Sequence, residues 1–126
     1  MGVYSIGVDM AEVERIRDMI ERHGDRFLKR VFTDSEIAYC RQKATYAQNF
    51  AARFAAKEAV FKAAGTGLVV GMNWRDVEVI NDEYGRPLVR LCGTTADMLK
   101  GKTIHLSLSH TAQAAIAMVV AEEIEN

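Results

Sequence analysis

The chain has 126 residues, of which 49% are hydrophobic and 26% charged, and its formal net charge at pH 7 is -1. This size and composition predict one globular domain over residues 1–126. The near-neutral charge argues against a general nucleic-acid binder, and no apolar run reaches the roughly 18 residues of a membrane span. Two cysteines, Cys40 and Cys92, are too few for a disulfide framework, and we expect no signal peptide before the fold. We therefore expect free thiols and a cytoplasmic protein.

Helical and strand patterns alternate along the chain. The predicted elements are a strand over 3–8, helices over 11–23, 34–43 and 47–64, strands over 76–80 and 87–91, a short helix over 94–100, and strands over 104–109 and 114–120. Gly24 and Gly65 are typical helix stops. Thr33 and Glu36 have the spacing of a capping box. These elements predict an α+β fold, with a mainly antiparallel sheet packed against one long and several shorter helices.

The long helix over 47–64 carries an aromatic stripe with a carboxylate at its edge. Phe50, Phe54 and Phe61 fall within about 40° of one another at helical spacing, and Glu58 lies roughly 40–60° from the last two. A carboxylate beside an apolar face is costly unless something pairs with it. Two interpretations stay open: Glu58 and Lys62 form a surface pair, or Glu58 binds a metal and Lys62 a phosphate.

Asp9 stands at the end of the first predicted strand. It could cap the following helix, or it could join Glu58 in holding a hard cation. Magnesium commonly takes one or two protein carboxylates and fills its other positions with water and substrate phosphates. The sequence has no CxxC pair and no two-histidine helix motif, so a zinc site is not expected. Gly65 and Thr66, which follow a basic helix, are either a cap and turn or an approach to a phosphate.

Three stretches of the chain resemble the signatures of the holo-acyl-carrier-protein synthase family. They are residues 7–16 (GVDMAEVERI), 53–67 (RFAAKEAVFKAAGTG) and 105–111 (HLSLSHT), and they occur in the family's order. The second stretch is very specific, and the resemblance covers essentially the whole chain. Leu108 stands where the family often has threonine or another small residue, and we expect no functional consequence.

The resemblance implies both a reaction and an assembly. Members use magnesium and coenzyme A to convert apo-acyl carrier protein to its holo form, releasing adenosine 3',5'-bisphosphate, a step that supports fatty acid biosynthesis. They are compact α+β domains that usually form homotrimers with active sites between subunits. Larger relatives carry two such halves in one chain, so this half-length unit would have to assemble. We place the small residues Ala115 and Ala117 near the three-fold axis, where they would allow close approach.

The resemblance also implies roles for individual residues. Asp9 and Glu58 match the metal ligands, and Lys62 is placed to contact the diphosphate and to protonate the leaving group. The base is either a metal-associated water or Glu58, and the nucleophile is the serine of the carrier. The expected contacts to the nucleotide and its phosphates, in addition to Lys62, are Arg53, Lys57, Gly65, Thr66 and His110.

A strip of arginines on the first predicted helix has two interpretations. Arg22 and Arg26 each fall within about 20° of Arg15 at helical spacing, on the side away from the apolar residues. Acidic neighbours nearly balance their charge, as on an ordinary solvated face. In the family, however, this helix meets the acidic carrier protein, which makes the strip a docking surface.

Three other functions would fit parts of this pattern. They are a coenzyme A-binding module without catalysis, a magnesium-dependent nucleotide hydrolase, and a structural subunit whose charged pairs are surface salt bridges. The presence of both Asp9 and Glu58 favours the transferase over a binding module.

Overall fold

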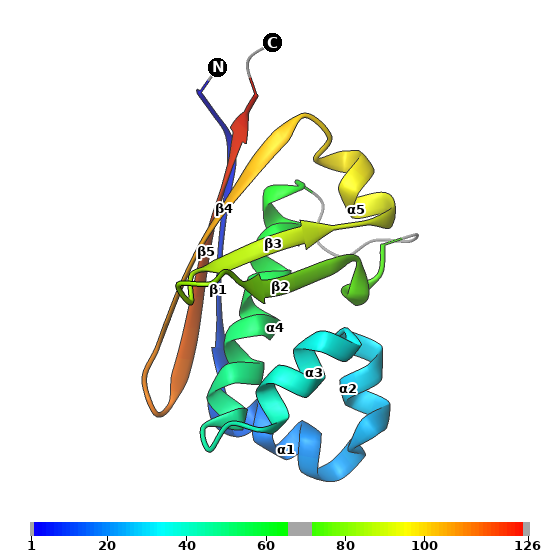
Figure 1. The fold of residues 1–126 in the computed structure, drawn as a ribbon, viewed down its shortest axis with the longest axis vertical. Helices are drawn as coiled ribbons and strands as arrows, with labels where there is room; N and C mark the ends of the chain where they lie inside the picture. Colours follow the sequence, from blue (N-terminus) through cyan, green and yellow to red (C-terminus); the bar gives the residue numbers. More distant parts are fainter. Residues whose placement is uncertain (1, 66–71, 125–126) are drawn as a thin grey trace.

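One long helix packs against a three-stranded antiparallel sheet (Figure 1). The computed structural model describes residues 2–65 and 72–124. The sheet has the order β1–β5–β4, in which the first strand pairs with the last. Its strands are β1 (Gly2–Glu12), β4 (Lys102–His110) and β5 (Ala114–Glu123), and the helix is α4 (Tyr46–Ala63). The described termini consequently lie side by side at one end of the sheet.

The remaining elements cover the other sides of α4. Three short helices gather around its N-terminal end, and a separate hairpin crosses in front of it (Figure 1). The helices are α1 (Val13–His23), α2 (Asp25–Val31) and α3 (Asp34–Arg41); the hairpin is β2 (Val77–Asn81) and β3 (Pro87–Leu91), preceded by the 3-10 turn η1 (Trp74–Asp76) and followed by α5 (Gly93–Met98). Within the described ranges, no helix is long and apolar enough to cross a membrane.

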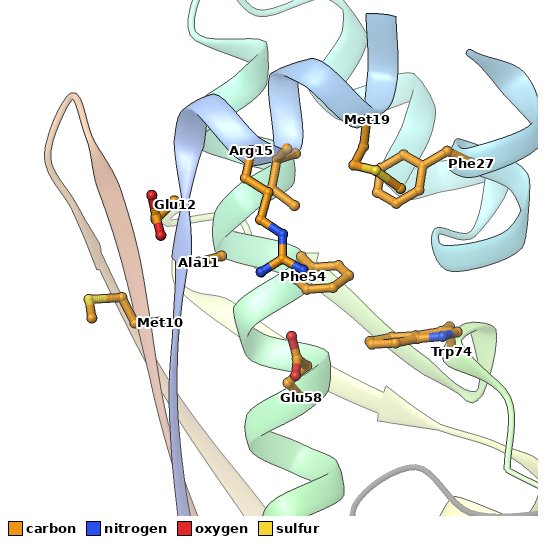
Figure 2. Close-up of a pocket in the computed structure, with 10 residues that line it drawn as sticks. Met10, Ala11, Glu12, Arg15, Met19, Phe27, Phe54, Glu58 and Trp74 are labelled. Carbon is orange, nitrogen blue, oxygen red and sulfur yellow. The ribbon is translucent and has the colours of Figure 1, made fainter. Parts of the chain in front are cut away.

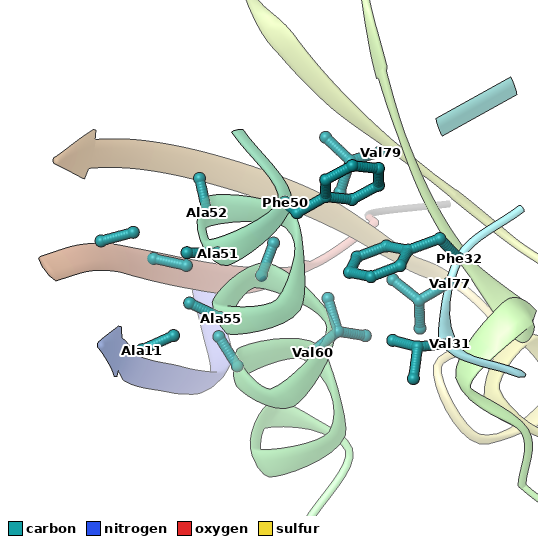
Figure 3. Packing of buried hydrophobic residues seen from close by; sticks show 14 of the residues in the cluster. Ala11, Val31, Phe32, Phe50, Ala51, Ala52, Ala55, Val60, Val77 and Val79 are labelled. Carbon is teal, nitrogen blue, oxygen red and sulfur yellow. The ribbon is translucent and has the colours of Figure 1, made fainter. Parts of the chain in front are cut away.

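The core lies on both sides of α4, because twelve of the eighteen residues of this helix are buried. Alanines such as Ala51 and Ala55 face the sheet, where their small side chains let the strands come close. Phe50 faces the opposite way and packs against Phe32, with ring centroids 4.9 Å apart (Figure 3). A helix that is apolar nearly all round belongs in the centre of a fold, and this one occupies it.

The predicted fold class is confirmed, and most element boundaries lie within three residues of the predicted ones. Thr33 and Glu36 form the predicted capping box, in which each side chain accepts a hydrogen bond from the other residue's backbone N–H. Gly24 ends α1 with a positive φ of 53°, as predicted. One helix was missed: α2 begins immediately after Gly24 and is only 7 residues long.

The first strand is longer than the sequence predicts. It continues past Asp9 to Glu12, because β5 pairs with it along its whole length. Asp9 is therefore a mid-strand residue opposite Ala117 and not a helix cap. The residue that caps α1 is Glu12, which makes no side-chain capping hydrogen bond.

Apolar side chains cover the face of the sheet that points away from α4. This outer sheet face consists of Ile6, Val8, Met10, Ile116 and Met118, which are 45–68% exposed. The strand register places Val8 opposite Met118 and Met10 opposite Ile116, so the patch is continuous across two strands.

The alanines of β5 point the other way. Ala115 and Ala117 are fully buried, on the side of β5 that packs against α4. The prediction that they allow close approach between subunits is wrong, because alternate residues of a strand face opposite sides of the sheet.

Candidate functional site

Close contacts fasten β1 to the C-terminal half of α4. Gly7 permits the approach, since a Cβ atom at this position would lie 2.1 Å from the Ala59 carbonyl oxygen. The Ser5 hydroxyl donates a hydrogen bond of 2.6 Å to the carbonyl of Ala63, where the helix ends. Asp9, two residues after Gly7, is thereby held beside the helix.

Two carboxylates and an ammonium group meet at this junction. Lys62 Nζ lies 3.0 Å from Asp9 Oδ1 and donates a second hydrogen bond of 3.1 Å to the carbonyl of Val8. Glu58 precedes Lys62 by one helical turn, yet Lys62 pairs with Asp9 and not with Glu58, so the surface-pair interpretation is wrong.

The environment of Glu58 is unfavourable to its negative charge. Partial burial raises the pKa of Glu58 to about 7, and the neighbouring Asp9 carboxylate adds to this shift. Lys62 and Arg15 act in the opposite direction by lowering that pKa. Near neutral pH, Glu58 is thus poised to gain or lose a proton, or to exchange its proton for a cation.

A cavity of ≈ 380 Å³ opens next to Glu58. Figure 2 shows the Arg15 guanidinium reaching from α1 toward Phe54 and Glu58, while Trp74 of η1 closes the opposite side. The remaining lining residues are Met10, Ala11, Glu12, Ile16, Met19 and Phe27. The cavity therefore combines a charged edge at Glu58 and Arg15 with an apolar wall.

Sequence reasoning singled out Phe54 but missed Trp74, Met19 and Phe27, which complete this apolar wall. Trp74 stacks on Phe54 with ring centroids 5.0 Å apart and meets Phe61 edge-on at 5.5 Å. Met19 and Phe27 come from two different helices. Apolar periodicity in α1 could have indicated Met19, three residues after Ile16, but nothing in the sequence places Trp74 against Phe54.

Lys57 lies inside the protein and not at the cavity. Its side chain is fully buried and forms an ion pair of 2.8 Å with the equally buried Glu36. Burial lowers the pKa of Lys57, and the charge of Glu36 opposes that shift. The ammonium group therefore does not reach a ligand in this structure, and the predicted contact to a phosphate does not fit its position.

Arg53 lines a different cavity from Glu58. At five residues' separation the two side chains point about 140° apart around α4. Arg53 Nη2 donates a hydrogen bond of 2.8 Å to Asn81 Oδ1, and its guanidinium lies 4.5 Å from the centre of the Tyr39 ring. Its buried Nε has no hydrogen-bond partner among the described residues.

The other predicted nucleotide contacts are not gathered at the Glu58 cavity either. His110 is the exposed last residue of β4, and β5 separates that strand from β1. Gly65 follows α4 with a φ of 97°, as expected for a glycine cap. Thr66 lies outside the described residues.

The predicted arginine strip is divided between two helices. Arg15 and Arg22 lie on α1, whereas Arg26 belongs to α2. The angle calculated for Arg26 on a single continuous helix therefore does not apply. Arg26 lines a shallow cavity of ≈ 220 Å³ together with Met19, His23, Phe27 and Arg30. Arg30 was missed, although it lies one turn from Arg26. The basic surface thus continues from α1 onto α2.

Comparison with known proteins defines the class to which this fold and site belong. The family model of the 4'-phosphopantetheinyl transferase superfamily matches residues 5–119, and the chain belongs to this family. Among its relatives is the holo-[acyl-carrier-protein] synthase of Koribacter versatilis, which is 48% identical over 96% of this chain and 99% of the relative.

Solved structures agree with this assignment. The synthase of Bacillus anthracis, in complex with CoA (3',5'-ADP), is 34% identical and superimposes with a TM-score of 0.82 over 98% of this chain and 99% of that one. The synthase of Helicobacter pylori, in complex with coenzyme A, is 32% identical with a TM-score of 0.83 over 92% of this chain and 98% of that one.

Proposed function

We propose that this protein transfers the 4'-phosphopantetheine group of coenzyme A to a serine of apo-acyl carrier protein. The products are holo-acyl carrier protein and adenosine 3',5'-bisphosphate, and the reaction supports fatty acid biosynthesis. The observation that carries the proposal is the meeting of Asp9, Glu58 and Lys62 beside an open cavity. Relatives with the same fold are holo-acyl-carrier-protein synthases, and two of their structures are complexes with coenzyme A or its nucleotide part.

The residues of this junction suit transfer from a diphosphate. The carrier serine oxygen attacks the phosphorus that bears pantetheine, and the bond to the bisphosphate leaving group breaks. Lys62, whose side chain is 52% exposed, can contact the diphosphate and donate a proton to the leaving phosphate. Glu58, the other carboxylate of this junction, is proposed to accept the proton of the serine hydroxyl.

Asp9 and Glu58 also fit a bound magnesium ion. Both are hard oxygen donors, and the Asp9 carboxylate raises the cost of the negative charge on Glu58, which a cation would relieve. The ion would supply positive charge beside the diphosphate. In the described part of the chain, no three histidine, cysteine or acidic side chains are grouped so that they could hold a metal ion. The proposed site consists of two carboxylates.

Magnesium affinity is expected to rise as the pH increases from 6 to 8. In the metal-free protein, the pKa of Glu58 is raised to about 7, so at lower pH a proton must leave before the cation binds. Calorimetry in buffers of different ionisation enthalpy should show proton release that is greatest at pH 6. Glu58→Gln should abolish this release. A magnesium affinity that is independent of pH would contradict the assignment of Glu58 as a ligand.

We further propose that the protein acts as a closed homotrimer with active sites between subunits. The apolar outer sheet face supports this, because exposed patches of this kind commonly mark protein interfaces. Arg53 and His110 support it as well, since in one chain they lie away from the Glu58 cavity. A neighbouring subunit could bring its own Arg53 or His110 to the nucleotide end of coenzyme A.

The basic residues at the start of the chain are proposed to dock the acidic carrier protein. Arg22→Glu and Arg26→Glu are each expected to raise the Michaelis constant for the carrier about 10-fold at low salt, and by less at high salt. The constant for coenzyme A should stay unchanged. Lys100→Glu, a charge reversal on an exposed residue beyond α5, is the matched control. Equal effects on both substrates, or none on either, would make these arginines an ordinary solvated face.

Arg15 is a less selective probe of docking than Arg22. Its guanidinium points toward Glu58 and lowers the pKa of that residue. Arg15→Glu would place a second negative charge there, so we expect it to change kcat as well as the Michaelis constant for the carrier.

A cytoplasmic location is proposed, since Cys40 and Cys92 are both free, as suits a reducing compartment. We propose no nucleic-acid or membrane partner.

Release of adenosine 3',5'-bisphosphate tests the proposed reaction against a nucleotide hydrolase. Chromatography should detect the bisphosphate only when apo-carrier accompanies the protein, magnesium and coenzyme A. Release without a carrier would indicate a hydrolase, and no release in the complete mixture would indicate a binding module or a structural subunit.

A further inference from the structure

The buried Glu36–Lys57 ion pair lies directly behind the apolar wall of the Glu58 cavity. Its two charged atoms are 2.8 Å apart, and both side chains are fully buried. Buried ion pairs contribute little net stability, because desolvating the charges offsets their attraction. Such a pair can instead fix a local geometry, and the contacts of Glu36 and Lys57 define that geometry here.

Glu36 connects the start of α3 to the hairpin. One carboxylate oxygen accepts the backbone N–H of Thr33 at 2.8 Å, and the other accepts the backbone N–H of Val79 at 2.8 Å. These two hydrogen bonds fix the Glu36 carboxylate in place. The carboxylate in turn holds the Lys57 ammonium group between α3, α4 and β2.

Lys57 uses that position to hold the η1 turn. Its ammonium group donates a hydrogen bond of 3.2 Å to the carbonyl of Trp74 and another to the carbonyl of Val77. These carbonyls belong to the first residue of η1 and to the residue that follows this turn. The ammonium thus binds η1 at both ends.

The side chain that η1 carries is part of the cavity wall. The Trp74 ring stacks on Phe54 at an interplanar angle of 21°, and both residues line the cavity with Glu58 (Figure 2). Lys57 and Glu58 are adjacent on α4, but their side chains point in different directions. Lys57 is buried behind the cavity wall, whereas Glu58 lines the cavity itself.

We propose that Lys57, held by Glu36, is a positioning residue that fixes η1 so that Trp74 forms the apolar wall of the reaction cavity. This role rests on the proposed function, and it replaces a phosphate contact for Lys57. Lys57 touches no substrate; it acts on transfer through the backbone carbonyl of Trp74.

The test uses a neutral pair that leaves no buried charge unpaired. In Glu36→Gln/Lys57→Met, the glutamine keeps an oxygen for a backbone N–H, while the donor to Trp74 and Val77 is lost. The matched control is Val119→Ala, which removes volume from a fully buried residue of β5. Both variants are expected to lower stability, but only the first is expected to release η1.

Trp74 reports on its own position, because the chain contains one tryptophan. Without substrates, Glu36→Gln/Lys57→Met should shift the fluorescence emission to longer wavelength and increase quenching by acrylamide, with the far-ultraviolet circular dichroism unchanged. Its kcat/KM for transfer should fall about 10- to 100-fold. Val119→Ala should retain wild-type fluorescence and rate. Wild-type fluorescence in the paired variant, or an equal rate loss in the control, would overturn the proposal.

A second comparison tests whether Lys57 acts through Trp74. Trp74→Ala should itself lower kcat/KM, and adding Glu36→Gln/Lys57→Met to it should lower the rate no further. Additive losses, or wild-type activity in Trp74→Ala, would overturn the positioning role. The fluorescence readout needs no substrate. If the wild-type protein failed to modify a carrier, the proposed reaction would fail, while the effect of Lys57 on Trp74 would still be measured.

Discussion

Glu58→Gln and Asp9→Asn are each expected to lower kcat/KM for transfer by about 10²–10⁴-fold, the range typical of removing an acid–base group. Each variant takes one oxygen donor and one negative charge from the proposed magnesium site. Glu58→Gln also removes the group proposed to accept the serine proton. Initial rates at saturating and limiting magnesium measure the loss, with Asp97→Asn on α5 as a matched carboxylate-to-amide control.

The same variants should remain folded. The folded-state pKa of Glu58 is about 7, against an ordinary value of 4.5, so the folded protein holds a proton that the unfolded chain releases between these values. The free energy of unfolding therefore falls as the pH rises toward 7, because Glu58 must then carry its charge in the folded protein. A glutamine at this position stays neutral and does not lower the stability in this way. Asp9→Asn loses a partly exposed ion pair with Lys62, which contributes roughly 0–1 kcal/mol. Near-normal rates of Glu58→Gln at limiting magnesium would show that Glu58 is not a ligand.

Met118→Glu is expected to separate the proposed trimer and to reduce transfer at least about 100-fold. Met118 is 50% exposed in the centre of the outer sheet face, between Val8 on β1 and Ser107 on β4. A carboxylate buried there in an interface would have no partner, and the cost of burying it would exceed the gain from the surrounding apolar contacts.

Light scattering measures the oligomeric state of Met118→Glu, and a transfer assay on the same sample measures its rate. Ile124→Glu, which alters another exposed apolar residue outside the outer sheet face, is the control and should remain trimeric and active. A monomer of Met118→Glu with the wild-type rate would contradict the proposal that active sites form between subunits. A wild-type protein that is an active monomer at assay concentration would contradict it equally.

Local signals in this sequence predict local structure well. The Thr33–Glu36 capping box, the stop at Gly24 and the long alanine-rich helix each depend on residues close in sequence, and each is present. The end of β1 depends instead on pairing with β5, more than a hundred residues away in the chain, so the strand continues where the sequence suggested a stop at Asp9.

In the site, too, features that depend on contacts between distant segments could not be predicted from local sequence. Lys57 and Lys62 lie on one helix and in one motif, and periodicity alone cannot show that the first is buried against Glu36 while the second meets Asp9. Trp74 could not be assigned to the cavity, because its position depends on η1 and α4 together. The residues alone left the convergence of Asp9 and Glu58 as one of two interpretations, and the resemblance to a family favoured it.

The intact mass of an apo-acyl carrier protein, taken before and after incubation with this protein, coenzyme A and magnesium, shows whether phosphopantetheine is transferred. The carrier should gain the mass of one phosphopantetheine group. A carrier whose acceptor serine is replaced by alanine should gain nothing, and Glu58→Gln should leave the carrier largely unmodified over the same interval. A carrier of unchanged mass after incubation with the folded wild-type protein would contradict the proposed transferase activity.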